Sequence, residues 1–240
     1  MIPIDCIGLG KDYGSRAVLR DVTFSVEAGT VHALIGANGA GKTTLLKILA
    51  TLITPSTGQA RIGGEDVAGK SKRVRKSIGY ISSEERSFYW RLTGRQNLRF
   101  FAVLQGMKAA QSEERIDNLL WRLGLEKMGE RRFQEYSTGM KQALAIARGL
   151  LHDPPVILAD EPTRSLSPDA AKRFHEIIRD EAEKGKAILF ASHNLAEVDR
   201  LADTFVCLDE GRVVAGGKPG DLSMRTGIIR EGSLPVAGRL

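Results

Sequence analysis

Cysteine is scarce in this sequence, and the positions of the two cysteines exclude common uses of the residue. Cys6 and Cys207 lie far apart among 240 residues, and no Cys-x-x-Cys pair or Cys/His cluster surrounds either one. Disulfide frameworks and zinc sites need more cysteines at closer spacing. The four histidines have no ligand spacing either. We therefore expect two reduced, buried thiols in a cytosolic protein, and no metal site built from cysteine or histidine.

Long apolar runs are missing as well. No stretch approaches the roughly 18 apolar residues that a membrane-spanning helix needs. The opening MIPIDCIGLGKDYG has neither the basic start nor the apolar centre of a secretory signal. We expect a chain without spans or signal peptide, so that any work at a membrane would depend on spans supplied by another chain.

Acidic residues are sparse between residues 70 and 99, and this imbalance accounts for the net charge of +6. The stretch holds nine lysines and arginines against Glu84 and Glu85. A basic face of this kind could meet nucleic acid, anionic lipid headgroups or an acidic partner, or it could simply be solvated. No DNA- or RNA-reading motif accompanies it, so we expect no specific nucleic-acid binding.

The sequence does contain an alternation of strand-like and helix-like segments. Three short apolar runs, TVHALIG (30–36), VILAD (156–160) and AILFAS (187–192), each lead into a polar turn and then a helical pattern. This alternation predicts an α/β fold with a mostly parallel sheet flanked by helices. Between about 90 and 150, apolar residues recur at helical spacing, which predicts an inserted helical lobe.

The segment GANGAGKTT (36–44) predicts a phosphate-binding loop, because it fits G-x-x-x-x-G-K-[ST] between a strand-like run and a helix-like one. Glycines let backbone N–H groups surround phosphate oxygens, and the helix N-terminus adds partial positive charge. Lys42 would reach the terminal phosphates, and Thr43 would bind Mg²⁺. The expected nucleotide-binding residues of this loop are Gly36, Asn38, Gly39, Ala40, Gly41, Lys42, Thr43 and Thr44.

Two further strand ends carry residues suited to ATP hydrolysis. Asp160 ends VILAD and could hold Mg²⁺, while the adjacent Glu161 could act as the general base that polarises the attacking water. His193 follows the next apolar run and could hydrogen-bond a γ-phosphate. We expect Lys42, Glu161 and His193 to be catalytic, and Thr43 and Asp160 to bind the metal.

The segment YSTGMKQ (136–142) completes a set of motifs that resembles the ATP-binding subunits of ABC transporters. The phosphate loop, YSTGMKQ, ILADEPT, SLSPD and SHN follow in the order of that family, and the similarity covers about residues 4–218. STGM (137–140) resembles the family's signature LSGGQ, with Tyr136, Thr138 and Met140 in place of Leu, Gly and Gln. The resemblance implies a P-loop NTPase core with an N-terminal antiparallel β portion and an inserted helical lobe.

This resemblance also implies how the two anion-binding segments work. Two subunits would associate head to tail, with ATP between the phosphate loop of one and the signature turn of the other. Ser137 and the N–H groups around Gly139 would bind the γ-phosphate of the partner's nucleotide, and Tyr13 would stack on adenine. For Ser137, a helix N-cap is an alternative role that is compatible with the first.

The family resemblance further implies partners and a location. The partners would be a separate transmembrane permease and a second ABC ATPase subunit, most simply an identical chain, at the cytoplasmic face of the inner or plasma membrane. The aromatics Phe88, Tyr89 and Trp90 would line the groove that receives a helix of the permease, or else they belong to the core of the helical lobe. A single ABC ATPase domain would span 1–240, with its ATP-binding core at about 1–88 and 152–220, its helical lobe at about 89–151 and a tail at 221–240.

Two positions depart from the family pattern. Ser83 stands where relatives have a glutamine that contacts Mg²⁺, so it would be at most a weak metal ligand. Ser167 stands where an aspartate is usual. The expected function is ATP hydrolysis that powers transport, most similar to bacterial exporters. The alternatives are a soluble ABC-type ATPase acting on nucleic acid or ribosomes, and a catalytically weak partner in a heterodimer.

Overall fold

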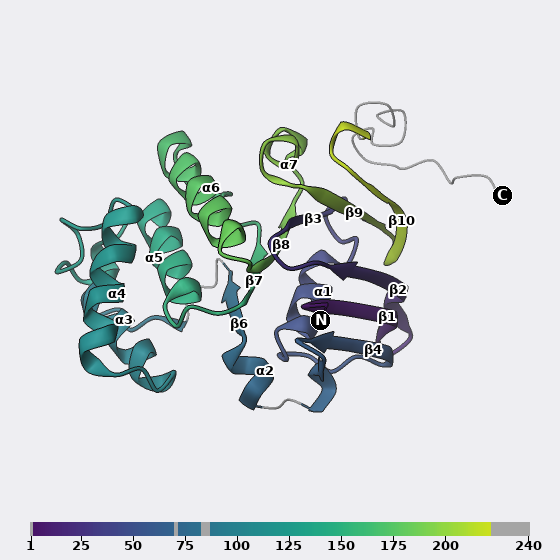
Figure 1. The fold of residues 1–240 in the computed structure, drawn as a ribbon, viewed down its shortest axis with the longest axis horizontal. Coiled ribbons are helices and arrows are strands. Elements are labelled where there is room, and N and C mark those ends of the chain that lie inside the picture. The colour runs from purple at the N-terminus through teal and green to yellow at the C-terminus, as the bar shows by residue number, and fades with distance from the viewer. Residues whose placement is uncertain (1, 70–71, 83–86, 222–240) are drawn as a thin grey trace.

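A six-stranded sheet forms the centre of the molecule, which the computed structural model describes at residues 2–69, 72–82 and 87–221. The strand order is β10-β9-β3-β8-β7-β6 (Figure 1). Neighbours from β9 to β6 pair in parallel, whereas β10 pairs antiparallel with β9. The strands are β3 (Val31–Ile35), β6 (Ile78–Ile81), β7 (Val156–Asp160), β8 (Ala187–Ser192), β9 (Thr204–Asp209) and β10 (Arg212–Gly217). The predicted mostly parallel sheet is confirmed.

The central strands of this sheet are mostly apolar because both faces are covered. Every residue of β3 and β8 is buried, and in β7 only Asp160 is partly exposed. Parallel strands covered on both sides read as continuous apolar runs rather than alternating ones. Since the carboxyl ends of parallel strands meet at one edge of the sheet, the polar residues that follow β3, β7 and β8 are brought together there.

A second sheet is antiparallel and formed mainly by the N-terminal part of the chain, with the order β2-β1-β4-β5. Its strands are β1 (Ile4–Tyr13), β2 (Arg16–Val26), β4 (Thr57–Ile62) and β5 (Glu65–Asp66). Helix α1 (Lys42–Leu49) lies between this sheet and the central one, and its buried leucines join both in a single apolar cluster. The antiparallel β portion expected from the family resemblance is confirmed.

Helices gather at one end of the molecule in a lobe beside the central sheet (Figure 1, left). They are α3 (Gly94–Leu104), α4 (Ala109–Arg122) and α5 (Thr138–Leu150), with a short 3₁₀ turn at Phe133–Glu135. Thr93 and Gln96 form a reciprocal capping box that fixes the start of α3. The helical lobe is therefore present, while its treatment as a separate subdomain stays a prediction.

The remaining helices complete the cover of the central sheet. They are α2 (Lys72–Lys76), α6 (Pro168–Glu183), α7 (Leu195–Leu201) and a 3₁₀ turn at Val67–Gly69. Residues of α5, α6 and α7 share one apolar cluster with the sheet, while α1 belongs to the other. The lobe therefore has no separate core, because α5 is buried at each residue from 142 to 147 and shares this cluster with both the sheet and the other helices of the lobe.

Both cysteines are buried and carry free thiols, as predicted. Burial raises the pKa of the Cys207 thiol to about 11 and raises that of Cys6 as well. Neither thiol is therefore ionised near neutral pH, which excludes them as nucleophiles. None of the helices described here combines the length and apolar character required to span a bilayer.

Candidate active site

The loop between β3 and α1 has a backbone that only glycine can adopt at two of its positions. Gly36 and Gly41 have φ angles of 153° and 107°. A Cβ atom on Gly36 would lie 2.3 Å from the carbonyl oxygen of Leu208, and one on Gly41 would lie 2.7 Å from the Leu19 side chain. The loop thus packs against two strands before it enters α1 at Gly41. This is the strand–loop–helix context that the phosphate-loop motif requires.

Lys42 lies folded over this loop. Its side-chain ammonium donates hydrogen bonds to the carbonyl oxygens of Gly36 (2.7 Å) and Ala37 (3.0 Å). Burial lowers the pKa of Lys42, and the nearby carboxylates of Glu161 and Asp160 oppose that shift. A buried cation whose hydrogen-bond acceptors are uncharged is stabilised further when an anionic group binds beside it. The lysine is therefore positioned to bind phosphate.

Asp160 ends β7 beside the first turn of α1. The Thr43 hydroxyl hydrogen-bonds its carboxylate, but burial outweighs this contact and raises the pKa of Asp160. A hydroxyl and a carboxylate are oxygen ligands of the kind Mg²⁺ takes when nucleotide phosphates and water supply the rest. The described part of the chain contains no group of three or more His, Cys, Asp or Glu residues that could hold a metal ion.

Glu161 and His193 face each other from the ends of neighbouring strands. The Nδ1 atom of His193 lies 3.1 Å from Oε1 of Glu161, and Arg164 lies 3.7 Å from the other carboxylate oxygen. Glu161 has a left-handed φ of 45°, a conformation that costs a non-glycine residue about 1–3 kcal/mol. Its N–H donates to Ala191 on β8 (3.1 Å), which helps to hold the strained turn. Two of the three predicted catalytic residues, Glu161 and His193, are therefore adjacent.

One cavity of about 290 Å³ collects most of these groups. Its lining residues are Arg16, Val18, Asn38, Gly39, Gly41, Lys42, Thr43, Thr44 and Glu161. The phosphate loop and the expected base thus meet in a single space. Arg16 and Val18, from β2, were not predicted. The basic Arg16, three residues after the expected adenine-stacking tyrosine, is the signal that could have suggested a second cation.

Tyr13 lies at the end of β1, opposite Arg16 in the β1–β2 pairing. Its ring is 48% exposed, and the ammonium of Lys11 lies 5.0 Å from the ring centroid. Tyr13 itself is not among the residues that line the cavity, whereas its pairing partner is. Stacking of Tyr13 on adenine stays a prediction.

The signature turn lies apart from the phosphate loop. Ser137 caps α5, and its hydroxyl accepts a hydrogen bond from the Met140 N–H at 3.3 Å, so the helix-cap role is confirmed. A Cβ on Gly139 would lie 3.0 Å from the Ser165 carbonyl oxygen, which leaves little room for a larger residue. Neither Ser137 nor Gly139 lines the cavity at the phosphate loop. Within one chain, the two expected anion sites are therefore separate.

The positions that depart from the family pattern divide into two cases. Ser167 caps α6 and accepts a hydrogen bond from the Ala170 N–H at 3.3 Å, a role that aspartate fills equally well. Ser83 lies outside the described residues, so its role as a weak metal ligand stays a prediction.

The three aromatics after this segment differ in burial, so the two roles considered for them separate. Phe88 is buried, with its ring centroid 4.7 Å from that of Phe133, so it belongs to the apolar cluster that the helical lobe shares with the central sheet. Tyr89 and Trp90 are half exposed. Only these two remain candidates for a partner surface.

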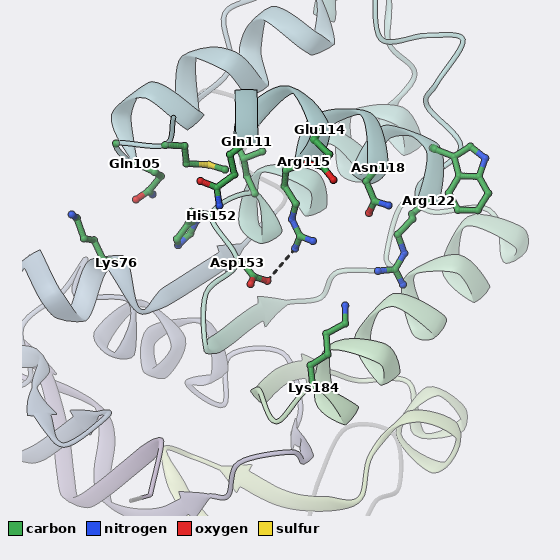
Figure 2. A pocket seen from close by; sticks show the side chains of 14 residues that line it. Lys76, Gln105, Gln111, Glu114, Arg115, Asn118, Arg122, His152, Asp153 and Lys184 are labelled. Carbon is green, nitrogen blue, oxygen red and sulfur yellow. Dashed lines mark hydrogen bonds and ion pairs between the residues drawn. The ribbon is translucent and has the colours of Figure 1, made fainter. Parts of the chain in front are cut away.

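A larger cavity of about 800 Å³ lies beneath α4, away from the phosphate loop (Figure 2). Its charged groups largely neutralise one another: Arg115 pairs with Asp153 at 3.4 Å, and Lys184 pairs with Glu181 at 2.8 Å. Arg122 is likewise paired with acids of α6. Three of its four lysine and arginine side chains are therefore paired with acids, and none of its lining residues belongs to the phosphate loop.

A phosphate loop after β3, an acid at the end of β7 and a paired glutamate and histidine define an ATPase of the P-loop class. Residues 19–164 match the family described as ABC transporter. The chain belongs to this family.

Individual relatives extend this similarity over most of the chain. It is 38% identical over 199 residues to the ABC transporter ATP-binding protein NatA of Bacillus subtilis (strain 168), which covers 83% of this chain and 81% of NatA. It is 35% identical over 218 residues to the Nod factor export ATP-binding protein I of Rhizobium sp. (strain N33), and this match covers 91% of this chain and 71% of that protein. A solved structure of an ATP-binding subunit of an ABC transporter matches with a TM-score of 0.86 at 35% identity, covering 98% and 96%. The chain is an ATP-binding and ATP-hydrolysing subunit of this transporter family.

Proposed function

We propose that this chain powers export through a separate transmembrane permease, by binding and hydrolysing Mg²⁺–ATP between two ATPase subunits at the cytoplasmic face of a membrane. The observation that carries the proposal is the separation of two anion-binding segments. Lys42 and Thr43 lie in one cavity with Glu161, whereas Ser137 lies at the start of α5 outside it. A second subunit that presents its own Ser137 would complete the site.

The residues of the cavity and the neighbouring Asp160 have distinct roles in this proposal. Lys42 exchanges its two carbonyl partners for the β- and γ-phosphates, and the N–H groups of the loop surround the same oxygens. Thr43 and Asp160 hold Mg²⁺, which when bound neutralises charge that develops on the phosphate oxygens. These contacts orient the γ-phosphate toward Glu161.

Glu161 and His193 act on the attacking water in this scheme. Glu161 accepts a proton from water positioned at the γ-phosphate, and His193 holds that carboxylate through the 3.1 Å contact. The partner's Ser137 hydroxyl and the N–H groups near Gly139 would stabilise the transferred phosphoryl group from the opposite side. Closure of the two subunits around ATP and their separation after hydrolysis would drive the permease.

The direction of transport and the docking surface rest on more specific support. Export is supported by the similarity to the Nod factor export protein over 91% of this chain. Docking of a permease helix near Tyr89 and Trp90 is supported by their half-exposed rings. The ring centroid of Tyr89 lies 4.8 Å from that of Phe100 on α3, so the aromatic surface continues along that helix. Aromatic residues of this kind dominate the binding energy of many interfaces.

The proposal is tested by recovering the chain from its native membrane in mild detergent and identifying what accompanies it. We expect stoichiometric recovery of a multi-span membrane protein, and a reduced yield from a Tyr89→Ala/Trp90→Ala variant. An exposed-residue variant, Lys172→Ala on α6, is the control that should recover the partner as the wild type does. Recovery with ribosomes or nucleic acid instead of a membrane protein would overturn the proposal in favour of the soluble class.

A further inference from the structure

Glu197, in the first turn of α7, is a buried carboxylate outside the nucleotide cavity. Its side chain is 4% exposed. It accepts hydrogen bonds from the Thr163 hydroxyl (2.7 Å), the His175 Nε2–H (3.0 Å) and the Ser192 hydroxyl (2.7 Å). Burial alone would raise its pKa, but these three donors outweigh burial and lower the pKa of Glu197. The carboxylate is thus charged, buried and satisfied by side chains alone.

Two of these donors belong to the turns that carry the catalytic residues. Thr163 follows Glu161 by two residues, and Ser192 immediately precedes His193. The Ser192 hydroxyl also accepts a hydrogen bond from the Asn194 N–H at 3.1 Å, so the turn is held on both sides of His193. A single carboxylate therefore joins the two turns whose side chains meet at 3.1 Å in the active site.

The turn at Glu161 needs such support. Its left-handed backbone is strained, and strain at a functional residue persists only where surrounding contacts over-determine it. The Thr163 hydroxyl is the side-chain contact that ties this turn to Glu197. Loss of that contact would let the turn relax and shift the carboxylate of Glu161.

The third donor connects the turns to α6. Within the described residues, the other ring nitrogen of His175 is buried without a hydrogen-bond partner, so Glu197 is the group that orients the imidazole. Helix α6 begins at Pro168 and is capped by Ser167, both in the SLSPD segment. The carboxylate thus contacts three separate segments, namely the Glu161 turn, the His193 turn and α6.

We propose that Glu197 is a positioning residue that holds the Glu161 and His193 turns in register with each other and with α6. This inference rests on the proposed function, because it assumes that Glu161 and His193 act together on ATP. The link between the two turns does not depend on catalysis, because a change in one turn should be transmitted to the other through the shared Glu197 carboxylate.

The test uses two variants that each remove one hydroxyl bonded to Glu197; Ser192→Ala also removes the acceptor of the Asn194 N–H, so Thr163→Val is the cleaner of the two. Thr163→Val cuts the link to the Glu161 turn, and Ser192→Ala cuts the link to the His193 turn. We expect each to lower kcat about tenfold to a hundredfold, because small misplacements of catalytic groups cost this much. The Kd for ATP should stay within about threefold of the wild type, because the phosphate loop is untouched. Ser112→Ala, which removes another buried serine hydroxyl bonded only within α4, is the matched control and should retain kcat.

Amide hydrogen exchange on the nucleotide-free chain separates positioning from a merely local effect. Thr163→Val should speed exchange at Asn194, and Ser192→Ala should speed exchange at Glu161 and Arg164. Faster exchange confined to the mutated turn, or a kcat equal to that of Ser112→Ala, would overturn the inference. If the wild-type chain fails to hydrolyse ATP, the proposed function fails, while exchange across the two turns still decides the role of Glu197.

Discussion

Lys42 is buried although it carries a charge, and its surroundings explain why this arrangement is stable. The ammonium donates to two backbone carbonyls and lies near two carboxylates, which oppose the effect of burial on its pKa. Neutral carbonyls satisfy hydrogen bonding without neutralising a cation. The phosphates of a nucleotide would supply that missing charge, so the residue contributes more to binding than to folding.

Lys42→Ala is therefore expected to abolish tight ATP binding. Loss of a charged hydrogen bond to phosphate costs about 3 kcal/mol, which is roughly a hundredfold in affinity. A calorimetric titration of the purified chain with ATP measures the change in Kd. Lys172→Ala, an exposed lysine of α6 in a 4.0 Å pair with Glu176, should bind ATP as the wild type does. Wild-type affinity in Lys42→Ala would contradict the phosphate-loop assignment.

The sequence predicts those site residues that lie close together in the chain, because one local turn fixes their spacing. Gly36, Gly41 and Lys42 form one local turn, so their pattern is visible in the chain. Arg16 and Glu197 were not predicted, because their roles depend on segments that meet only after folding. Glu197 contacts Thr163 across 34 residues, and no local pattern marks that pairing.

Helix α5 connects the signature turn to the active site. Its start is capped by Ser137, and in its interior the buried Gln142 donates to the Pro162 carbonyl oxygen at 3.0 Å. Pro162 follows Glu161 directly. A rigid helix thus joins the segment expected to contact the partner's nucleotide to the turn that holds this chain's own base.

Ser137→Ala should separate the cap role from the phosphate-binding role. Loss of an N-cap hydroxyl costs about 1 kcal/mol of stability, and Thr93→Ala at the cap of α3 should cost a similar amount. Only Ser137→Ala should also lower kcat, because its hydroxyl would bind the partner's γ-phosphate. Thermal unfolding and steady-state ATPase assays measure the two effects. Equal kcat values in the two variants would leave Ser137 with the cap role alone.

At the scale of elements, sequence predicts best where a pattern is bounded on both sides. VILAD and AILFAS match β7 and β8 residue by residue. The helix-like run after the phosphate loop has no clear end in the sequence; in the structure α1 ends at Leu49, because Thr51 adopts a left-handed φ of 61° and the Leu52 N–H bonds to the Lys47 carbonyl oxygen. A helix-terminating turn of this kind usually has glycine at the left-handed position, so the threonine at position 51 gives no signal of it in the sequence.

The whole molecule contains one complete half of two different sites. Its phosphate loop and its signature turn lie in separate places, and the cavity of the first contains no residue of the second. In the proposed arrangement, a single chain would leave the γ-phosphate of its own nucleotide without the contacts expected from Ser137. Two copies arranged head to tail would complete two sites at once, with each chain contributing to both.

The most direct test of this account is the mass of a Glu161→Gln variant, measured by light scattering with saturating ATP and Mg²⁺. Removal of the base should stop hydrolysis and retain ATP between two subunits, so the account predicts twice the mass of one chain. Adding Lys42→Ala or Ser137→Ala to this variant should restore the single-chain mass, because each removes one half of the composite site. A Glu161→Gln chain that binds ATP yet keeps the mass of one subunit would contradict the central claim.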